Sequence, residues 1–307
     1  MFFQVFFSNS KFYSIEACLH WVNRTSVDVP SGAAAYSSRH WQRPLVELRH
    51  ELLLSQLHSA RDVARLHAVS TPEAASLYFG LPSTRDGTRL SDPELSIAIG
   101  MRLGLPVAAH AICACGTELD VLGDHALTCN FGVERFRRHN EVNLRIRNSL
   151  NEAGFPAVLE PVGVSARDSR RFDGVTVAAF ECGRPMAWDA TIIHTCAPSH
   201  LKTAVSAAGD AASAAESLKR QRYADLNGRF DFRAVGMETL GAFGPQALEL
   251  VASVASRVRS FTGEQSARLR ITRRLAAAIQ AGNARTIIAA HASMLHERFA
   301  GAFQLLA

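Results

Sequence analysis

The chain has 307 residues, of which 48% are hydrophobic and 20% are charged, as is ordinary for a soluble protein with a sizeable core. This length allows one large domain or two to three small ones. Six cysteines are too few for a disulfide scaffold, and no run approaches the roughly 18 apolar residues that cross a membrane. The net charge of +5 and the pI near 9.1 favour a polyanionic partner, although basic faces are often only solvated.

The N-terminal part, residues 1–104, is predicted to be mostly helical and to serve packing. Its opening MFFQVFF lacks a basic region and is soon interrupted by polar residues, so we expect no signal peptide and an intracellular protein. Residues 1–40 show no convincing period, whereas apolar residues recur at helical spacing from Trp41 onward. Two further helices are predicted to start at residues 70–73 (STPE) and 91–94 (SDPE).

Four potential metal ligands lie together in the next segment, residues 105–131, which we predict to be a zinc knuckle. They are Cys113, Cys115, His125 and Cys129. This number of cysteine and histidine ligands satisfies a closed tetrahedral zinc site, and His125 and Cys129 can share one face of a helical turn. Such a site would be structural, because four protein ligands leave no open position for catalysis. The alternative is two core cysteines and a solvent-exposed histidine.

The rest of the chain alternates between helical patterns and short apolar runs typical of strands. A basic helix is predicted over residues 132–153, three strands around 157–164, 174–180 and 186–194, an alanine-rich helix from Pro198 to about Leu226, a fourth strand at 232–239, and then two C-terminal helices. The order helix, three strands, helix, strand predicts a core over residues 132–245, followed by C-terminal helices over residues 246–307. The fold class is therefore expected to be mixed, α+β or α/β.

Two aspartates, Asp173 and Asp189, lie on neighbouring predicted strands. A hairpin of these strands would bring both carboxylates to one end of a sheet, where they offer the oxygen ligands that a divalent cation such as Mg²⁺ prefers. An aspartate inside an apolar strand is costly unless it is paired or bound to a cation. The alternative is a surface-facing acid, or one bound to Arg171 or Arg184.

Several segments resemble, in their order along the chain, the C-terminal part of non-LTR retrotransposon polyproteins from about Trp41 to Ile288. They are CACGTELDVLGDHALTC, RFRRHN, LEPVGV, RFDGVTV, MAWDATII and METLG, with QAGNA as the last. In those polyproteins a Cys-Cys-His-Cys knuckle precedes a restriction-endonuclease-like domain of the broad PD-(D/E)xK class, whose core order is helix, three strands, helix, strand. The resemblance therefore implies a restriction-endonuclease-like core with a helical N-terminal region, a zinc knuckle and C-terminal helices.

The resemblance also implies catalytic roles for particular residues. Asp173 matches the aspartate of the PD motif and Asp189 the second acid, which in this class hold the Mg²⁺ that activates water and neutralises charge on the scissile phosphate. The usual lysine would stand where this chain has Thr191. In relatives of this retrotransposon type a lysine on the following helix takes over, and Lys219 is the matching residue here. Arg222 stands where relatives often have a second lysine, and it can clamp phosphate but cannot serve as a base.

Residue spacing supports Lys219 as the third group of this site. A set of residues recurs at alternating spacings of three and four, which places them on one stripe of the predicted alanine-rich helix: Leu201, Val205, Ala208, Ala212, Ala215, Lys219 and Arg222. Lys219 would continue the face that packs on the sheet, and its ammonium could extend toward the acids. The alternative is an ordinary lysine with a buried stem at a helix end.

Other residues are weaker candidates for the same chemistry. Glu160, at the end of the first strand, could add a magnesium ligand, and Glu238 on the last strand is a less favoured candidate. Structural roles are an equal alternative for both. Basic residues on the 132–153 helix and at the end of the alanine-rich helix are candidate contacts to nucleic-acid phosphates: Arg135, Arg137, Arg138, His139 and Arg222. The alternative for the basic helix is a solvated face.

Two departures from the family pattern bear on function. Phe172 replaces the proline expected before Asp173, and the sequence contains no polymerase region, so we expect a truncated element copy, a fragmentary gene model or a repurposed domain. The resulting hypothesis is a retrotransposon-derived, Mg²⁺-dependent DNA endonuclease-like domain with a structural zinc, in the nucleus, with DNA or RNA as partner and neither membrane nor small-molecule substrate. The alternatives are a catalytically inactive nucleic-acid-binding relic and an unrelated helical interaction protein.

Overall fold

The computed structural model describes residues 42–162, 170–181, 183–226 and 228–304, with side chains described between residues 46 and 291 of those ranges. The unpatterned stretch 1–40 lies outside the described residues. The chain divides into two compact units, residues 1–56 and residues 57–307. The first unit contributes helix α2 (Gln42–Ser55) to the description, and all other described elements belong to the second. No helix in these ranges is both long and apolar enough to cross a membrane.

Short helices open the second unit and confirm the two predicted helix starts. They are α3 (Ala60–Val69), α4 (Pro72–Ser76), the 3-10 helix η2 (Leu77–Phe79) and α5 (Asp92–Leu103). The Thr71 hydroxyl caps α4 by accepting a hydrogen bond from the Ala74 amide at 3.2 Å. Ser91 and Glu94 cap α5 reciprocally, and Glu94 Oε2 accepts from the Ser91 amide at 2.8 Å. The helical pattern from Trp41 is interrupted, because residues 57–59 are not helical.

A mixed four-stranded sheet lies at the centre of the second unit. Its strands, in spatial order, are β3 (Ala157–Leu159), β4 (Gly174–Ala179), β5 (Pro185–Ile193) and β6 (Asp231–Glu238). The first three are antiparallel neighbours, whereas β5 and β6 run parallel. Each strand lies where the sequence predicts one. However, β3 is shorter than the predicted run 157–164, because Glu160 adopts a left-handed backbone conformation with a φ of 46°.

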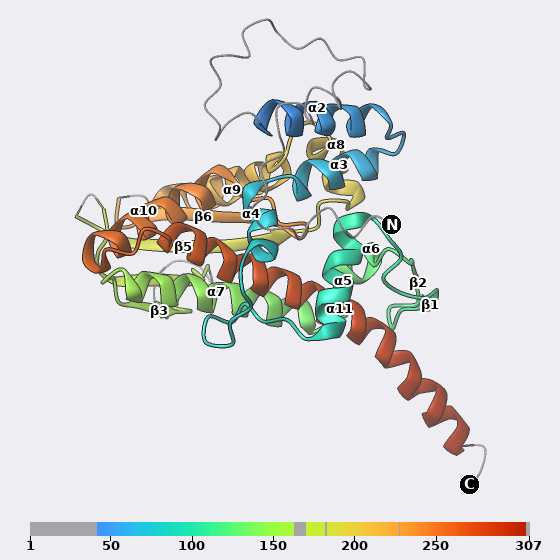
Figure 1. The fold of residues 1–307 in the computed structure, drawn as a ribbon. Helices are drawn as coiled ribbons and strands as arrows, with labels where there is room; N and C mark the ends of the chain where they lie inside the picture. Colours follow the sequence, from blue (N-terminus) through green and yellow to red (C-terminus); the bar gives the residue numbers. More distant parts are fainter. Residues whose placement is uncertain (1–41, 163–169, 182, 227, 305–307) are drawn as a thin grey trace, which may run out of the picture. The chain divides into compact units, whose positions relative to one another are not determined.

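Helices cover both faces of this sheet. They are α7 (Glu134–Glu152), α8 (Pro198–Ala204), α9 (Asp210–Arg222), the 3-10 helix η3 (Ala224–Leu226), α10 (Pro245–Thr262) and α11 (Ala267–Gln304). Figure 1 shows α9 and α7 on opposite sides of β5 and β6. The prediction of one alanine-rich helix from Pro198 to Leu226 is wrong, because the chain turns at Gly209, whose φ of 81° favours glycine. The predicted stripe therefore holds on α9 alone, from Ala212 to Arg222.

The side chains of β5 alternate between two cores. Met186, Trp188 and Ala190 pack with buried residues of α7, β6, α10 and α11 on one face of the sheet. Ala187 packs on the opposite face with a cluster of aromatic residues. The two-residue period of a strand puts Asp189 on the same face as Ala187, which directs its carboxylate toward α9. A strand with two buried faces thus carries one charged residue.

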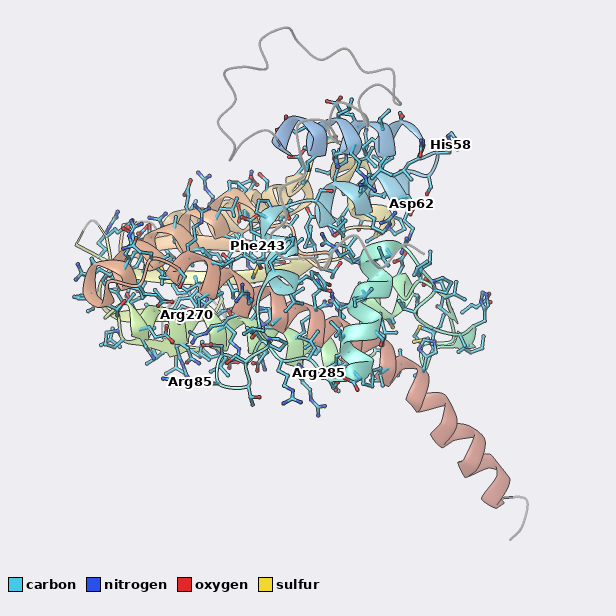
Figure 2. The ribbon with its side chains drawn as sticks, viewed as in Figure 1. His58, Asp62, Arg85, Phe243, Arg270 and Arg285 are labelled. Atoms are coloured by element: carbon cyan, nitrogen blue, oxygen red, sulfur yellow. The ribbon has the colours of Figure 1, made fainter. Side chains whose placement is uncertain are left out.

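The arginine-rich segment 268–274 forms internal ion pairs. Arg270 on α11, which is labelled in Figure 2, binds Glu152 of α7 at 2.7 Å. Arg274 binds the same carboxylate at 2.6 Å and Asp86 at 2.5 Å. These pairs tie α11 to α7 and to the loop before α5. The two arginines are therefore neutralised within the fold and give no support to a polyanion-binding face in this segment.

Candidate active site and metal centre

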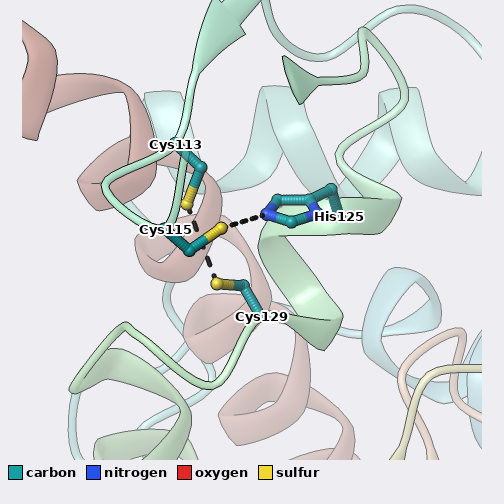
Figure 3. Close-up of side chains that lie close together, drawn as sticks. All are labelled: Cys113, Cys115, His125 and Cys129. Carbon is teal, nitrogen blue, oxygen red and sulfur yellow. Dashed lines mark hydrogen bonds between the residues drawn. The ribbon is translucent and has the colours of Figure 1, made fainter. Parts of the chain in front are cut away.

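The predicted zinc ligands come together in space. Cys113 Sγ lies 3.7 Å from Cys129 Sγ, and Cys115 Sγ lies 3.3 Å from His125 Nε2 (Figure 3). All four ligand atoms lie within 4.8 Å of one another. A tetrahedral zinc ion with Zn–S bonds of about 2.3 Å separates two sulfur ligands by about 3.8 Å. The cluster can therefore hold a metal ion such as zinc with little rearrangement.

Short elements of local structure place these ligands. They are β1 (Ala111–Ile112), β2 (Glu118–Leu119) and α6 (Asp124–Thr128). The two N-terminal cysteines lie in the loop of the β1–β2 hairpin. The Asp120 carboxylate accepts hydrogen bonds from the Asp124 amide at 3.1 Å and the His125 amide at 2.7 Å, which fixes the start of α6. The Cys129 amide donates to the His125 carbonyl at 2.8 Å, so these two ligands lie one helical turn apart, as the spacing predicts.

Cys113 and Cys115 of the knuckle have different pKa values because their surroundings differ. Burial raises the pKa of Cys113 to about 11, whereas hydrogen bonds from the side chain and amide of Thr117 lower the pKa of Cys115 to about 6. The thiolate is the form that binds a metal. Cys115 thus offers a thiolate at neutral pH, and the buried Cys113 becomes one when a metal ion supplies positive charge. The Phe131 amide donates to Cys129 Sγ at 3.4 Å.

A second group of potential ligands consists of Asp124, His194 and Cys196, whose ligand atoms also lie within 4.8 Å of one another. Here Arg61 donates to both Asp124 oxygens, at 2.5 Å and 2.8 Å, and burial raises the pKa of Cys196 to about 12. His194 Nε2 lies 3.0 Å from Asp124, and its Nδ1 lies 2.9 Å from the Thr239 hydroxyl. Because a guanidinium already neutralises the acid, this group serves as a buried polar link between α3, α6 and the end of the sheet.

The two predicted catalytic aspartates lie at the start of β4 and within β5, which are neighbouring strands. Asp173 directly precedes β4, its amide donates to the Trp188 carbonyl at 3.0 Å, and its Oδ2 accepts from the Ala190 amide at 2.6 Å. Asp189 stands between these two residues of β5. Lys219 of α9 places its Nζ 2.6 Å from Asp189 Oδ1. Two carboxylates and one ammonium, from three separate elements, thus converge at one place.

His139 of α7 approaches the same acids. Its Nε2 lies 3.0 Å from Asp173 Oδ2 and 3.3 Å from the Ala190 carbonyl. The side-chain nitrogen of Asn143 lies 3.3 Å from His139 Nδ1, and Asn143 Oδ1 accepts from the buried Trp188 indole at 3.0 Å. The same Asn143 nitrogen lies 3.4 Å from His139 Nε2, so the amide contacts both ring nitrogens. A buried indole therefore orients the histidine through one amide side chain.

Burial and neighbouring charges shift the pKa values of Asp173 and Asp189 in opposite directions. Burial alone would raise the pKa of Asp173, but hydrogen bonds from His139 and the Ala190 amide lower it overall. Burial raises the pKa of Asp189, and the charge of Asp173 adds to this effect against the opposing charge of Lys219. Burial lowers the pKa of His139, yet the bond to Asp173 raises it overall. Asp173 is therefore the firmly ionised acid, and Asp189 gains most from a nearby cation.

An open groove of about 390 Å³ lies beside these residues. Its lining joins the end of the knuckle, α7, β5 and α9: Asn130, Gly132, Arg135, Phe136, Arg138, His139, Ala190, Thr191, Ile192 and Lys219. Thr191, which stands at the position of the usual lysine, is among them. The groove therefore gives a molecule from solvent access to the lysine of the acid–lysine pair.

Two predicted acidic candidates have carboxylates that are engaged elsewhere. The Glu160 amide donates to the Asp173 carbonyl at 2.9 Å, but the exposed Glu160 side chain binds Arg171 at 3.1 Å. Glu238 is 1% exposed and accepts a hydrogen bond from the Ala212 amide at 3.4 Å. Burial raises the pKa of Glu238. Both carboxylates thus have partners outside the acid pair, although the backbone of Glu160 adjoins Asp173.

The predicted nucleic-acid contacts differ in how free their side chains are. Arg135 donates to two backbone carbonyls at the end of the knuckle, at 2.9 Å and 3.2 Å. Arg137 is exposed and pairs with Glu134 at 2.5 Å. Arg222 is exposed, whereas Arg138 is buried. The basic helix is therefore not one uniform charged face.

Sequence reasoning missed two residues that organise the site. Asn143 lies one helical turn after His139, and Tyr223 one turn after Lys219, so the four-residue spacing on a helix could have identified both. The Tyr223 hydroxyl donates to the Arg171 carbonyl at 3.0 Å, and burial together with the charge of Asp189 raises its pKa. Its ring packs 5.0 Å from that of the buried Phe172. Phe172 thus anchors by aromatic packing the turn that a proline was expected to shape.

No protein-family model matches the sequence, and no curated protein matches it either. The resemblance to retrotransposon polyproteins therefore stays a prediction from motifs. What the structure adds is a mixed α/β fold, a cluster that can hold a metal ion such as zinc, and an acid pair with a lysine beside it. Function has to be inferred from the geometry of these groups.

Proposed function

We propose that this chain carries a retrotransposon-derived, metal-dependent endonuclease domain that hydrolyses phosphodiester bonds in DNA. The observation that carries the proposal is the convergence of Asp173, Asp189 and Lys219, with Lys219 Nζ 2.6 Å from Asp189. Paired carboxylates suit a hard divalent cation, and a fixed ammonium stabilises charge that develops on a phosphate. The open groove beside the lysine supports access for a polyanion.

The residues present fit Mg²⁺. This ion binds in proteins through one or two carboxylates and leaves its other positions to water and to substrate phosphates. After burial, the charge of Asp173 is the main contribution that raises the pKa of Asp189, so the two carboxylates are close enough to repel each other. Asp173 and Asp189 would hold the ion, which relieves this repulsion. When bound, Mg²⁺ activates a water ligand and neutralises charge on a phosphate.

The other polar residues have supporting tasks in this proposal. Lys219 can turn from Asp189 toward a phosphate oxygen, because its side chain is 26% exposed and borders the groove. His139 holds the Asp173 carboxylate in one orientation through Nε2. Asn143 and Trp188 in turn fix the histidine ring. His139 is therefore a positioning residue in this reaction.

The order and pairing of elements support the same class of enzyme. Helix α7, strands β3 to β5, helix α9 and strand β6 follow the order helix, three strands, helix, strand that a restriction-endonuclease-like core implies. Asp173 directly precedes the second strand of that series, and Asp189 lies within the third. The Cys-Cys-His-Cys cluster would carry a structural zinc ion, since its four ligands leave no open position. DNA as partner and a nuclear location belong to the same proposal.

A catalytically inactive nucleic-acid-binding domain is the second candidate. It is favoured by one observation: each acid already has a partner, Lys219 for Asp189 and His139 for Asp173. The site is thus electrostatically satisfied without a metal ion, and the fold would persist if catalysis were lost. Cleavage assays separate the two candidates, because both share the same fold and knuckle.

Nicking of supercoiled plasmid DNA tests the proposal directly. The zinc-loaded full chain is expected to convert supercoiled plasmid to the open circular form when Mg²⁺ is present and not when Mg²⁺ is omitted, because two carboxylates alone cannot activate water. Gel electrophoresis measures the conversion. Protein that binds plasmid but leaves it supercoiled at every Mg²⁺ concentration would establish the inactive candidate instead.

Lys219 has a matched control within the chain. We expect Lys219→Met to reduce nicking by about 100-fold, because it removes the cation that stabilises negative charge beside the acids. Lys202, exposed on α8, has no contact with the site, so Lys202→Met should keep at least half of the activity. Equal loss in both variants would mean that lysine charge acts on DNA binding in general and that Lys219 has no special role.

A further inference from the structure

The groove beside the acid pair has residues that the proposed cleavage chemistry does not use. Phe136, in the first turn of α7, lines this groove and is 69% exposed, which is unusual for a large aromatic side chain. Arg135 and Arg138 lie on the same helix and line the same groove. The groove therefore combines an exposed aromatic ring with two arginines in its lining.

Arg138 is a buried cation without a counter-charge. The residue is 3% exposed, its Nη1 donates to Asn283 Oδ1 at 2.7 Å, and its Nε has no hydrogen-bond partner among the described residues. Burial and the charge of Arg135 lower its pKa to about 10, and no carboxylate of the described chain offsets them. The group is still charged at neutral pH. A buried charge of this kind is costly unless an anion joins it.

Dedicated contacts hold Arg138 in this costly position. Gly282 of α11 lies against its stem, and a Cβ at that position would lie 2.4 Å from Arg138 Cγ. Asn283, the next residue, orients the guanidinium, and its own amide is fixed by donating to the Thr239 carbonyl at 2.7 Å. A charge that destabilises the fold and yet is positioned by several residues is typical of a binding site.

We propose that this groove binds one unpaired nucleotide of a DNA strand, with its phosphate on Arg138 and Arg135 and its base against the ring of Phe136. The inference rests on the proposed endonuclease function, because the nucleotide would lie next to the residues that cleave the strand. The groove of about 390 Å³ is of the size that small-ligand sites have, about 300–1,000 Å³. Base stacking accepts every base, so this subsite would be independent of sequence.

An unpaired strand suits the groove better than a duplex or a protein segment. In a duplex the base faces are already stacked on their neighbours, so the ring of Phe136 could not meet one. An apolar protein segment would cover Phe136 but would bring no anion to Arg138. Only a partner with both a π-face and a phosphate satisfies both residues.

Fluorescence anisotropy with a short labelled single-stranded DNA, in the absence of Mg²⁺, tests the base contact in the zinc-loaded full chain. We expect Phe136→Ala to weaken binding by about tenfold. Phe131 is equally exposed, at 69%, but does not line the groove, so Phe131→Ala should change binding by less than about twofold. An abasic oligonucleotide should bind the wild-type chain and Phe136→Ala equally. Equal weakening by the two phenylalanine variants, or no binding at all, would overturn the inference.

The phosphate contact has its own readout. Arg138→Met is expected to lower the slope of log affinity against log salt concentration by about one, because one phosphate contact is lost. Arg257→Met, which removes an exposed arginine of α10, should leave the slope unchanged. A well-folded Arg138→Met protein with the wild-type slope would disprove the phosphate contact. If Arg138→Met does not fold, the binding assay with Phe136→Ala and Phe131→Ala decides whether the groove binds a nucleotide.

The outcomes of these binding assays are separable from those of the nicking assay. A chain that never cleaves plasmid but binds single strands through Phe136 retains this subsite and loses only the proposed catalysis. A chain that cleaves plasmid with Mg²⁺ but shows no preference for Phe136 over Phe131 retains catalysis and loses only the subsite.

Discussion

Replacement of Asp189 by asparagine is expected to reduce Mg²⁺-dependent nicking by more than about 100-fold. Mutation of a residue that only hydrogen-bonds to a metal ligand already reduces metal affinity or activity by about 10- to 100-fold, and loss of a ligand should cost more. Asparagine keeps the shape of the side chain but removes the charge that would share a cation with Asp173. It also frees Lys219, whose ammonium lies 2.6 Å from Asp189 Oδ1. The variant therefore loses the proposed metal ligand and the partner that positions the lysine.

The same substitution should leave the fold intact, which makes the result interpretable. Asp189 is 5% exposed, and burial raises its pKa, so its carboxylate is held at a cost to stability. A neutral isostere removes that cost, while the partly exposed Lys219 can extend into solvent. We expect the melting temperature of Asp189→Asn to equal or exceed that of the wild type, as is common when a functional charge is removed.

Asp231 provides the matched control for this prediction. It begins β6, the strand next to Asp189, and binds Arg233 at 3.1 Å. Asp231→Asn removes one carboxylate from the same sheet without touching the acid pair, and Arg233 keeps Glu181 and Glu249 as partners, so nicking should stay within about twofold of the wild type. Nicking by Asp189→Asn at the wild-type rate would show that the observed cleavage comes from another site or from a contaminating nuclease.

Local sequence signals predict the elements that carry the site. The capping residues Ser91 and Glu94 mark the start of α5, because a cap depends on residues only a few positions apart. The spacing of His125 and Cys129 likewise predicts one helical turn, since it depends on local helix geometry alone. The alternation of apolar residues around Asp189 predicts a strand with its acid on one face. In each case the determining interaction lies within one element or one turn.

The partners of these residues could not be predicted in the same way. Arg138 finds Asn283, which is 145 positions away in the chain, and the sequence around Arg138 favours an exposed basic helix just as well. The contact between His139 and Asp173 depends on how α7 packs against the sheet. The predicted helix over residues 198–226 fails for a related reason, because Gly209 is also compatible with a helix interior unless tertiary packing selects its left-handed conformation.

The knuckle is part of the fold and not an appendage to it. Cys113 and Leu127 of the knuckle pack in one hydrophobic cluster with Leu240 after β6 and Ile287 of α11. Asp124, which directly precedes His125 of the cluster, bonds to Arg61 of α3 and to His194, the residue that follows β5. A change in the metal cluster therefore affects a core that also includes residues following β5 and β6, such as Cys196 and Leu240.

Loss of the metal is for this reason expected to destabilise the whole second unit. Cys113→Ser should reduce bound zinc from one ion per chain to none and lower the melting temperature by about 6–12 °C, which corresponds to about 3 kcal/mol for a domain of this size. The physical reason is that the free energy of metal binding is folding free energy when the site does not exist in the unfolded chain. Metal analysis and calorimetry give the two quantities.

Cys196→Ser separates the metal from the packing of a buried thiol. Cys196 belongs to the same hydrophobic cluster as Cys113 and is similarly buried, but it lies outside the tetrad. Its replacement should cost some stability and leave one zinc ion bound. Two ions in the wild type, with one lost in Cys196→Ser, would mean that Arg61 does not neutralise Asp124 as its two hydrogen bonds indicate. Unchanged zinc content in Cys113→Ser would contradict the assignment of these four residues as the zinc ligands. Their ligand atoms lie close enough together for all four to bind one ion, and a structural zinc site needs four ligands.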